Sequence, residues 1–313
     1  MATNPRLYVV QHSAWTDEDR WQRELTLAQE MGFGGIRCGW ANLHLITSDG
    51  KALSNWGRRL VVDSLERYKK WGFRLHITLN QSMPYGCTKE LAFAAQKFVI
   101  DEAVARFVPE ELSFSIENEP QAWAEQKIDL RLCEFAKEVI AYWDSSKIHE
   151  RGYWMYAPTQ HGWMGWPLTE QLPMGLETYR NLARIWWVYT QPEYREWMRR
   201  LGFALNLYVP PDYRYKADFY AVEKAISASK LVSDHFVGHP QAITEFNIRE
   251  ATVPSEYWRG YKAGAMAKAL LKLPNFKFVT LYVLGEHEGM NFIKSDGTIY
   301  QRKVDGWRKA LFG

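Results

Sequence analysis

The sequence predicts an α/β fold, a single (β/α)8 TIM barrel that takes in residues 1–313. Eight segments have the alternating or continuously apolar pattern of strands, helical patterns lie between them, and no linker rich in Pro, Gly or Ser divides the chain. Alternating strands and helices imply parallel pairing, and eight such strands form a closed barrel in one domain.

The eight predicted strands recur along the whole chain. They are RLYVVQ (6–11), GGIRCG (34–39), FRLHITLN (73–80), LSFSIEN (112–118), YWMYAP (153–158), FALNLYV (203–209), QAITEF (241–246) and FKFVTLYVL (276–284). Several are rich in β-branched and aromatic residues, as strands usually are.

Helices are predicted between these strands. The clearest patterns cover 16–32, 55–72, 88–107 and about 129–149. Thr16 and Asp19 have the spacing of a capping box at the start of the first helix. The second helix carries apolar residues on one face, namely Trp56, Leu60, Tyr68 and Trp71.

Four glycines mark the expected ends of helices, and each is followed by an aromatic residue that enters the next strand. They are Gly32, Gly72, Gly152 and Gly202. Glycine is the usual residue where a helix ends in the left-handed conformation. The repeated pattern supports a fold made of similar units.

Composition and charge exclude several classes of protein. With 47% hydrophobic and 24% charged residues, the chain has the composition of a globular protein. Its net charge is only +3, and its Lys and Arg residues are spread along helical faces and form no basic block, which argues against a nucleic-acid partner. No apolar run is long enough to cross a membrane. The oligomeric state is not indicated.

The location of the protein stays open. The segment MATNPRLYVV leads directly into a strand and has no signal-peptide pattern, so cytoplasmic, virion-carried and trimmed secreted proteins are all compatible with it. Cys38, Cys87 and Cys133 form no CxxC pair and no even set, which favours free thiols over disulfides or a structural zinc site.

Polar residues alternate with apolar ones on three of the predicted strands. In a barrel one parity faces the helices and the other faces the axis. The polar parity consists of Arg74, His76, Thr78 and Asn80 on the third strand, Ser113, Ser115, Glu117 and Glu119 on the fourth, and Asn206 and Tyr208 on the sixth. Ionisable groups buried at strand ends are costly unless paired or used, so we expect a functional site there.

Two carboxylates are expected to face each other across the barrel mouth. Glu119 ends the fourth strand and Glu245 lies near the end of the seventh, and these strands are nearly opposite in an eight-stranded barrel. Cleavage of a glycosidic bond needs one carboxylic acid to protonate the leaving oxygen and one carboxylate to attack the anomeric carbon. A gap of about 5–5.5 Å would indicate retention of configuration.

These residues resemble the clan of (β/α)8 glycoside hydrolases that keep the acid/base after strand four and the nucleophile on strand seven. Asn118-Glu119-Pro120 is similar to the clan's Asn-Glu-Pro motif, which implies that Glu119 is the acid/base and that Asn118 binds the sugar 2-hydroxyl. The resemblance also implies that Glu245 is the nucleophile, with Arg37 beside it and Tyr208 bonded to it. Arg37 and Tyr208 would keep the nucleophile ionised, and partial desolvation would raise the pKa of Glu119.

Two positions depart from the clan. The clan commonly ends strand eight with a tryptophan that supports the sugar, whereas this strand continues into Glu286, His287 and Glu288. Many members carry a histidine two residues before the strand-six tyrosine, where this chain has Asn206. No family within the clan is assigned.

Further candidate residues lie at strand ends and in the long segments after the second and fifth strands. His76 and Asn80 could bind hydroxyl groups, and a core role for His76 is equally compatible with its pattern. Candidate stacking or supporting residues are Trp40, His161, Trp163 and Trp166, for which loop packing is an equal alternative, and Glu286 in a hydrogen-bonding loop. We expect no metal, because no converging set of ligands accompanies them.

The sequence therefore predicts a retaining β-glycoside hydrolase with a carbohydrate substrate and no cofactor. The long Trp-rich segments favour endo action on an oligosaccharide or polysaccharide. Three alternatives remain: a carbohydrate-binding barrel with little or no turnover, an exo-β-glycosidase, and a transglycosylase. A Schiff-base aldolase and an amidohydrolase are excluded, since no strand end has the lysine or the histidines that they need.

Overall fold

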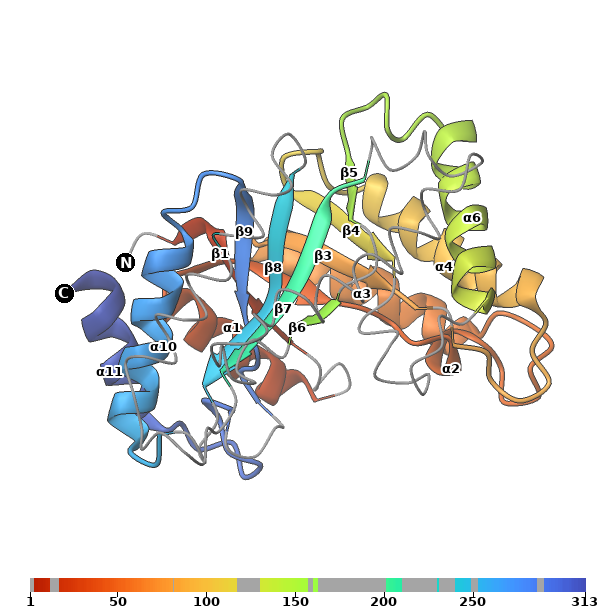
Figure 1. Cartoon of the computed structure of the whole chain (residues 1–313). Helices are drawn as coiled ribbons and strands as arrows, with labels where there is room; N and C mark the ends of the chain where they lie inside the picture. Colours follow the sequence, from red (N-terminus) through yellow and green to blue (C-terminus); the bar gives the residue numbers. More distant parts are fainter. Residues whose placement is uncertain are drawn as a thin grey trace. The chain divides into compact units, whose positions relative to one another are not determined.

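The computed structural model describes residues 3–11, 17–80, 82–116, 130–156, 160–162, 201–209, 230, 240–248, 253–285 and 290–313, of which 130–134, 160–162, 203, 205 and 207–209 are described by their backbone alone. The chain, drawn in Figure 1 with its helices and strands labelled, groups into two compact units by its internal contacts. The first takes in Met1–Ile36, Gln160–Trp186 and Phe203–Gly313, and the second takes in Arg37–Thr159 and Trp187–Gly202. The assignment of residues 1–313 to a single domain stays a prediction.

The second unit contains the parallel strands β3 (Arg74–Leu79), β4 (Leu112–Ile116) and β5 (Trp154–Tyr156). Its helices are α2 (Asn42–Leu45), α3 (Asn55–Lys70), α4 (Lys89–Val104) and α6 (Leu130–Ser145). Ser54 caps α3 by accepting from the Gly57 amide, and Thr88 caps α4 by accepting from the Leu91 amide. These caps fix where the helices begin after their loops.

The first unit contains five parallel strands in the order β1-β9-β8-β7-β6. They are β1 (Asn4–Val10), β6 (Gln160–Gly162), β7 (Phe203–Val209), β8 (Gln241–Ile248) and β9 (Phe276–Leu281), and the helices are α1 (Glu18–Glu30), α10 (Glu256–Leu270) and α11 (Gln301–Phe312). All eight residues of β8 are buried, as expected for a parallel strand covered on both faces. Strand β2 (Phe33–Cys38) runs from this unit into the other, which begins at Arg37.

All eight predicted strands are present, so the parallel α/β class is confirmed in the described residues. Strand β6 was not predicted, because its three residues are too few to show an alternating pattern. The seventh and eighth predicted strands are therefore β8 and β9. Among the described residues, no helix is both long and apolar enough to span a membrane.

The predicted cap of the first helix is wrong. Asp17, not Thr16, is the N-cap of α1, and its carboxylate accepts a hydrogen bond from the Arg20 amide at 3.0 Å. Aspartate and threonine are both favourable caps, so the sequence pattern alone cannot separate two such neighbours.

Three of the four glycines predicted to end helices adopt the left-handed conformation. The φ angles of Gly32, Gly72 and Gly152 are 88°, 72° and 91°. Gly202 is the exception, because it has no positive φ and instead forms a parallel bridge with Tyr156.

The predicted apolar face of the second helix is partly wrong. Leu60 and Tyr68 are buried on α3, but Trp56 has an exposed fraction of 50%. Trp56 lies in the first turn of α3, where its ring meets the edge of His44 on α2 at a centroid distance of 6.4 Å. Its indole therefore packs against a loop helix and not against the sheet.

Helices α10 and α11 approach each other closely along a line of glycines (Figure 1). A Cβ on Gly260 would overlap the Lys303 carbonyl oxygen, and one on Gly306 would overlap the Tyr257 carbonyl oxygen. A Cβ on Gly264 would lie 2.8 Å from the Trp307 carbonyl oxygen. The two helices can pack at this distance only because side chains are absent there.

We predict that Gly260→Ala destabilises the protein by about 2 kcal/mol, the typical cost of overpacking. A Gly→Ala change inside an exposed helix normally stabilises by about 1 kcal/mol, so the sign is reversed here. Urea unfolding measures the effect, and Gly264→Ala, which has a longer closest contact, should cost less. A gain in stability for Gly260→Ala would contradict this packing.

Candidate active site

An extra residue in β8 determines where Glu245 lies. Ile243 and Phe246 are in register with Val279 and Leu281 of β9, so three steps along β8 match two steps along β9. On the other side, the consecutive β7 residues Leu205 and Asn206 pair with Ile243 and Glu245. Strand β8 therefore contains a bulge at Thr244–Glu245, a feature often found beside active sites.

The bulge moves Glu245 off the face of Ile243. Regular alternation would place these two residues on the same face, whereas the observed register aligns Glu245 with Asn206. Only 3% of Glu245 is exposed. The Thr244 hydroxyl donates to the side-chain oxygen of Asn206, the residue in register with Glu245, at 2.9 Å.

Met290, which follows β9 in the chain, is hydrogen-bonded to β8. The side-chain amide of Asn247 donates to the Met290 carbonyl at 3.0 Å. The ammonium of the buried Lys303 donates to the same carbonyl at 2.7 Å and to the Asn291 carbonyl at 2.9 Å. The Asn247 side chain, two residues beyond Glu245, is thereby bonded to a segment that Lys303 of α11 also holds.

A buried carboxylate also lies at the carboxyl ends of β1 and β9. Glu24 of α1 is 1% exposed and accepts hydrogen bonds from Gln11 at 3.0 Å and from Arg20 at 3.2 Å. A Cβ on Gly285 would lie 2.9 Å from the Glu24 carboxylate, so only glycine fits there unless the side chains move. This network fixes the ends of two strands that neighbour each other in the first unit.

In the second unit, Arg37 and His76 are buried near each other on β2 and β3. The His76 Nδ1 lies 2.9 Å from the Ser113 hydroxyl, and the Tyr156 ring meets the imidazole edge-on at a centroid distance of 5.6 Å. Burial first, and the Arg37 charge second, lower the pKa of His76 well below its usual value. Burial raises the pKa of the neighbouring Cys38 thiol, so Arg37 is the charged group of this cluster near neutral pH.

We predict that His76 makes the protein less stable in mild acid. The folded-state pKa is lowered, so the unfolded chain takes up the proton first, and stability present above about pH 6.5 is lost as the pH falls, by at most about 1.4 kcal/mol per unit. Urea unfolding at pH 7 and pH 5 should show a smaller loss for His76→Asn than for wild type.

The matched control for this pH effect is His149→Asn, which should keep the wild-type difference between the two pH values. His44 contributes a remaining slope of the same sign, since partial burial lowers its pKa too. An unchanged pH difference in His76→Asn would contradict a neutral buried His76.

Gln96 of α4 joins the loops that follow β2 and β3. Its amide nitrogen donates to the Trp40 carbonyl at 3.1 Å and to the Asn42 side-chain oxygen at 2.6 Å, and its oxygen accepts from the Asn80 amide at 3.1 Å. Asn42 donates in turn to the carbonyls of Asn80 and Ser82, at 3.0 and 2.8 Å. Neither Gln96 nor Asn42 is exposed to solvent.

Asn80 and Trp40, two candidate binding residues, have structural roles in or beside this network. The Asn80 side-chain oxygen accepts from the Ser82 amide at 2.9 Å, which forms a local turn. Trp40 has an exposed fraction of 0%, so its burial agrees with loop packing and not with an open stacking surface.

We predict that Gln96→Leu destabilises the protein by about 3 kcal/mol, because three buried polar groups lose their partner. Gln22→Leu on the exposed face of α1 should change stability by less than about 0.5 kcal/mol and serves as the control. Equal stability of Gln96→Leu and wild type in urea unfolding would show that these hydrogen bonds are not needed.

Several predicted site residues lie outside the described residues. These are Glu117, Asn118, Glu119, Trp163, Trp166 and Glu286. Tyr208 and His161 are described by their backbone alone, with Tyr208 in register with Asn247 and His161 with Asn206. Within the described part, no three His, Cys, Asp or Glu residues are grouped so that they could hold a metal ion.

The sequence reasoning missed the residues that support the site. Gln96 lies in the apolar stretch AFAAQKF, and a lone polar residue on such a face is a signal that could have indicated a buried hydrogen-bonding role. Glu24, within RELTLAQ, is a similar case. Asn42 and Gln11 had no comparable signal, because polar residues are ordinary in loops after strands.

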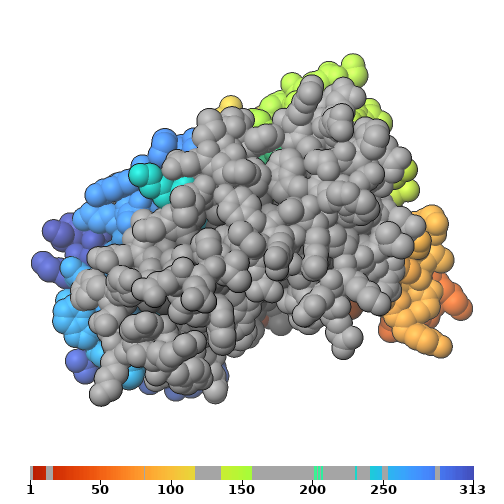
Figure 2. Space-filling model, viewed as in Figure 1, coloured from red at the N-terminus to blue at the C-terminus, as the bar shows by residue number. Residues whose placement is uncertain are grey.

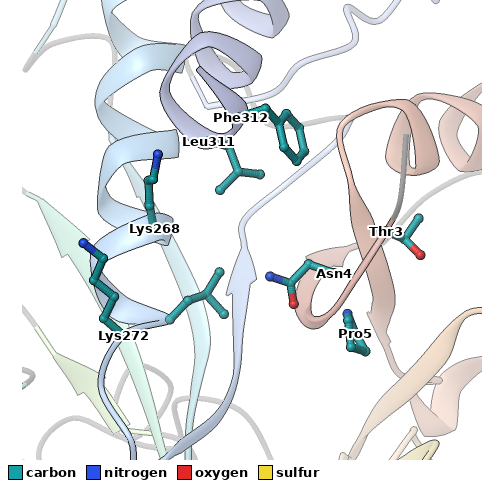
Figure 3. Close-up of a pocket in the computed structure, with 8 residues that line it drawn as sticks. Thr3, Asn4, Pro5, Lys268, Lys272, Leu311 and Phe312 are labelled. Carbon is teal, nitrogen blue, oxygen red and sulfur yellow. The ribbon is translucent and has the colours of Figure 1, made fainter.

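A pocket of about 580 Å³ lies at the other end of β1 (Figure 3). Asn4, at the amino end of β1, lines it together with Lys268, Lys272 and Phe312. The two lysines lie in the last turn of α10 and just beyond it, where cations interact favourably with the helix end. The pocket is thus separate from the residues at the carboxyl ends of the strands.

The chain superimposes on several solved structures of glycoside hydrolases. The chain superimposes on a family 39 glycoside hydrolase from Bacteroides cellulosilyticus WH2 with a TM-score of 0.64 and 14% identity, over 99% of this chain and 64% of that one. For GH5_18 from Streptomyces cattleya in complex with GlcNAc the TM-score is 0.66 at 12% identity, over 99% and 80%. A GH5-4 broad specificity endoglucanase from Clostridium acetobutylicum gives 0.59 at 12% identity, over 98% and 96%.

The likeness concerns the fold. The chain spans less than two thirds of the length of the family 39 structure. No protein-family model and no curated protein matches the sequence.

Proposed function

We propose that the protein is a retaining β-glycoside hydrolase that cleaves within an oligosaccharide or polysaccharide, on strands that close into an eight-stranded (β/α)8 barrel. The observation that carries the proposal is the buried Glu245, which a bulge displaces from the face of Ile243 and aligns with Asn206. Burial of a carboxylate is costly unless the group is paired or has a chemical role, and buried ionisable groups cluster at functional sites. Fold similarity to glycoside hydrolases of families 39 and 5 supports the same conclusion.

Glu245 and Glu119 take the two catalytic roles in this proposal. The Glu245 carboxylate attacks the anomeric carbon while Glu119 donates its proton to the leaving glycosidic oxygen, which gives a covalent glycosyl-enzyme and a free alcohol. Glu119 then removes a proton from water, and the resulting attack on the anomeric carbon releases the sugar and restores Glu245. The proton and electron pairs balance without a cofactor.

The supporting roles are assigned by the sequence resemblance. Asn118 binds the 2-hydroxyl, and Arg37 and Tyr208 keep the nucleophile ionised and oriented. Because burial and the Arg37 charge lower the pKa of His76 well below its usual value, His76 adds no second positive charge beside Arg37 near neutral pH.

Tyr282 is our candidate for the surface beneath the sugar, in place of the tryptophan that the clan has at this strand end. It directly follows β9, is partly buried, and its amide donates to the Phe246 carbonyl at 2.9 Å, so its backbone lies beside the residue after Glu245. An aromatic ring can stack on the apolar face of a pyranose.

We predict that Glu245→Gln and Glu119→Gln each reduce turnover by roughly 10³-fold or more, because each removes a group on which both steps depend. Release of reducing ends from mixed-linkage β-glucan, glucomannan, xylan and aryl β-glycosides measures this effect. Glu138→Gln, at an exposed position of α6, is the matched control and should retain activity.

A 2-deoxy-2-fluoro glycoside adds a direct test of the covalent step. Intact-mass measurement should show one adduct on wild type and none on Glu245→Gln. Saturable glycan binding without reducing ends and without an adduct would instead support a carbohydrate-binding protein. Products longer than the starting glycan would indicate transglycosylation.

A further inference from the structure

Exposed apolar side chains gather on the segments that follow β2 and β3. Of the nine large apolar side chains that are exposed in the described part of the chain, four belong to this region. They are Leu43, Trp56, Met83 and Tyr85, with exposed fractions of 61%, 50%, 40% and 97%, and we call them the aromatic rim. Grouped apolar exposure of this kind marks binding surfaces more often than scattered single residues do.

Contacts around α2 bring three members of the rim together. The Asn42 amide donates to the Ser82 carbonyl at 2.8 Å, so the neighbours of these two residues, Leu43 and Met83, lie on adjoining segments. The ring contact between His44 and Trp56 places the indole against the same short helix. The rim is thus formed by α2, the first turn of α3 and the loop after β3.

Tyr85 is presented by a rigid turn. The Cys87 amide donates to the Pro84 carbonyl at 3.0 Å, and Gly86 has a φ of 78°, which a type II turn requires at this position. A Cβ on Gly50 would lie 2.6 Å from the Gly86 carbonyl carbon, so a second turn supports the first by backbone contact. The two loops run side by side in Figure 1, and orange atoms from this part of the chain form surface at the right-hand edge of Figure 2.

The loops that carry the rim share a buried hydrogen-bond network with strand-end residues of the same unit. Asn42, which holds the loop after β3, is bonded to Gln96, and Gln96 also holds the backbone of Trp40 and Asn80. The same buried network therefore fixes strand-end residues and rim. All four rim side chains are uncharged, so they supply no counter-charge to an anionic partner.

We propose that the aromatic rim is a second carbohydrate-binding surface, which takes sugar units of a β-linked polysaccharide that lie outside the cleavage site. The proposal rests on the proposed function. Pyranose rings in β-linked chains present flat faces of C–H groups, and an exposed Tyr or Trp ring binds such a face without needing charge. A rigid turn and a packed helix start hold both rings with little loss of conformational freedom on binding.

The test is electrophoresis in native gels that contain mixed-linkage β-glucan, glucomannan or xylan, with Glu245→Gln as the parent so that no polymer is consumed. At least one polysaccharide should retard the parent. Trp56→Ala and Tyr85→Ala should each weaken binding roughly 2- to 10-fold, the range expected for one aromatic contact. Tyr85→Phe keeps the ring and should bind like the parent.

Trp258→Ala is the matched control, because Trp258 is 48% exposed on α10 and belongs to the first unit, whereas the rim belongs to the second. It should bind like the parent. In the active protein, the ratio of kcat/KM on polysaccharide to that on an aryl glycoside should fall for the double variant Trp56→Ala/Tyr85→Ala and should not fall for Trp258→Ala.

The proposal is overturned if no polysaccharide retards the parent, or if Trp56→Ala and Tyr85→Ala bind as tightly as Trp258→Ala. It is also overturned if sedimentation shows a dimer that dissociates in the double variant, since the rim would then be a contact between two copies of this chain. Because retardation requires no turnover, rim-dependent binding by an inactive wild type would refute the proposed hydrolysis and leave the rim intact.

Discussion

The candidate site depends on a carboxylate inside a strand that is buried along its whole length. Strand β8 has eight buried residues, and two apolar ones, Ile243 and Phe246, keep a common register with β9. A regular strand could not hold both in that register and also align Glu245 with Asn206. The extra residue at Thr244–Glu245 makes both alignments possible. Ile243 and Phe246 keep their register with β9, and Glu245 is aligned with Asn206.

In the second unit, side-chain amides hold the described loops after β2 and β3. A buried ion pair loses hydration that its attraction does not always recover, whereas the Gln96 amide can satisfy three neutral groups at little desolvation cost. Amides do not titrate, so these hydrogen bonds to Trp40 and Asn80 do not themselves depend on the pH. Arg37 then remains the main charge of the polar cluster around His76.

Strand positions followed from the sequence because apolar alternation is local, and RLYVVQ or FKFVTLYVL has that pattern whatever surrounds it. The bulge at Glu245 did not follow, because it is a relation between β8 and its two neighbours. Asp17 replaced Thr16 as the helix cap because two favourable caps adjoin. The bridging role of Gln96 was not predicted, because its hydrogen-bond partners, at residues 40, 42 and 80, are distant along the chain.

The aromatic residues illustrate why exposure requires the fold. Trp40 and Trp56 both follow β2, yet the first is fully buried beneath the loops and the second is half exposed. Helix α2 lies between the two tryptophans in the sequence. Its first residue, Asn42, donates to the Ser82 carbonyl, and its His44 ring contacts Trp56. A surface that lies beyond the strand ends contributes binding energy only to a substrate long enough to reach it. If the rim binds sugar units as proposed, it assists an enzyme that acts on polymers more than one that removes a single terminal sugar, so the exposure of Trp56 and Tyr85 agrees with the proposed endo action.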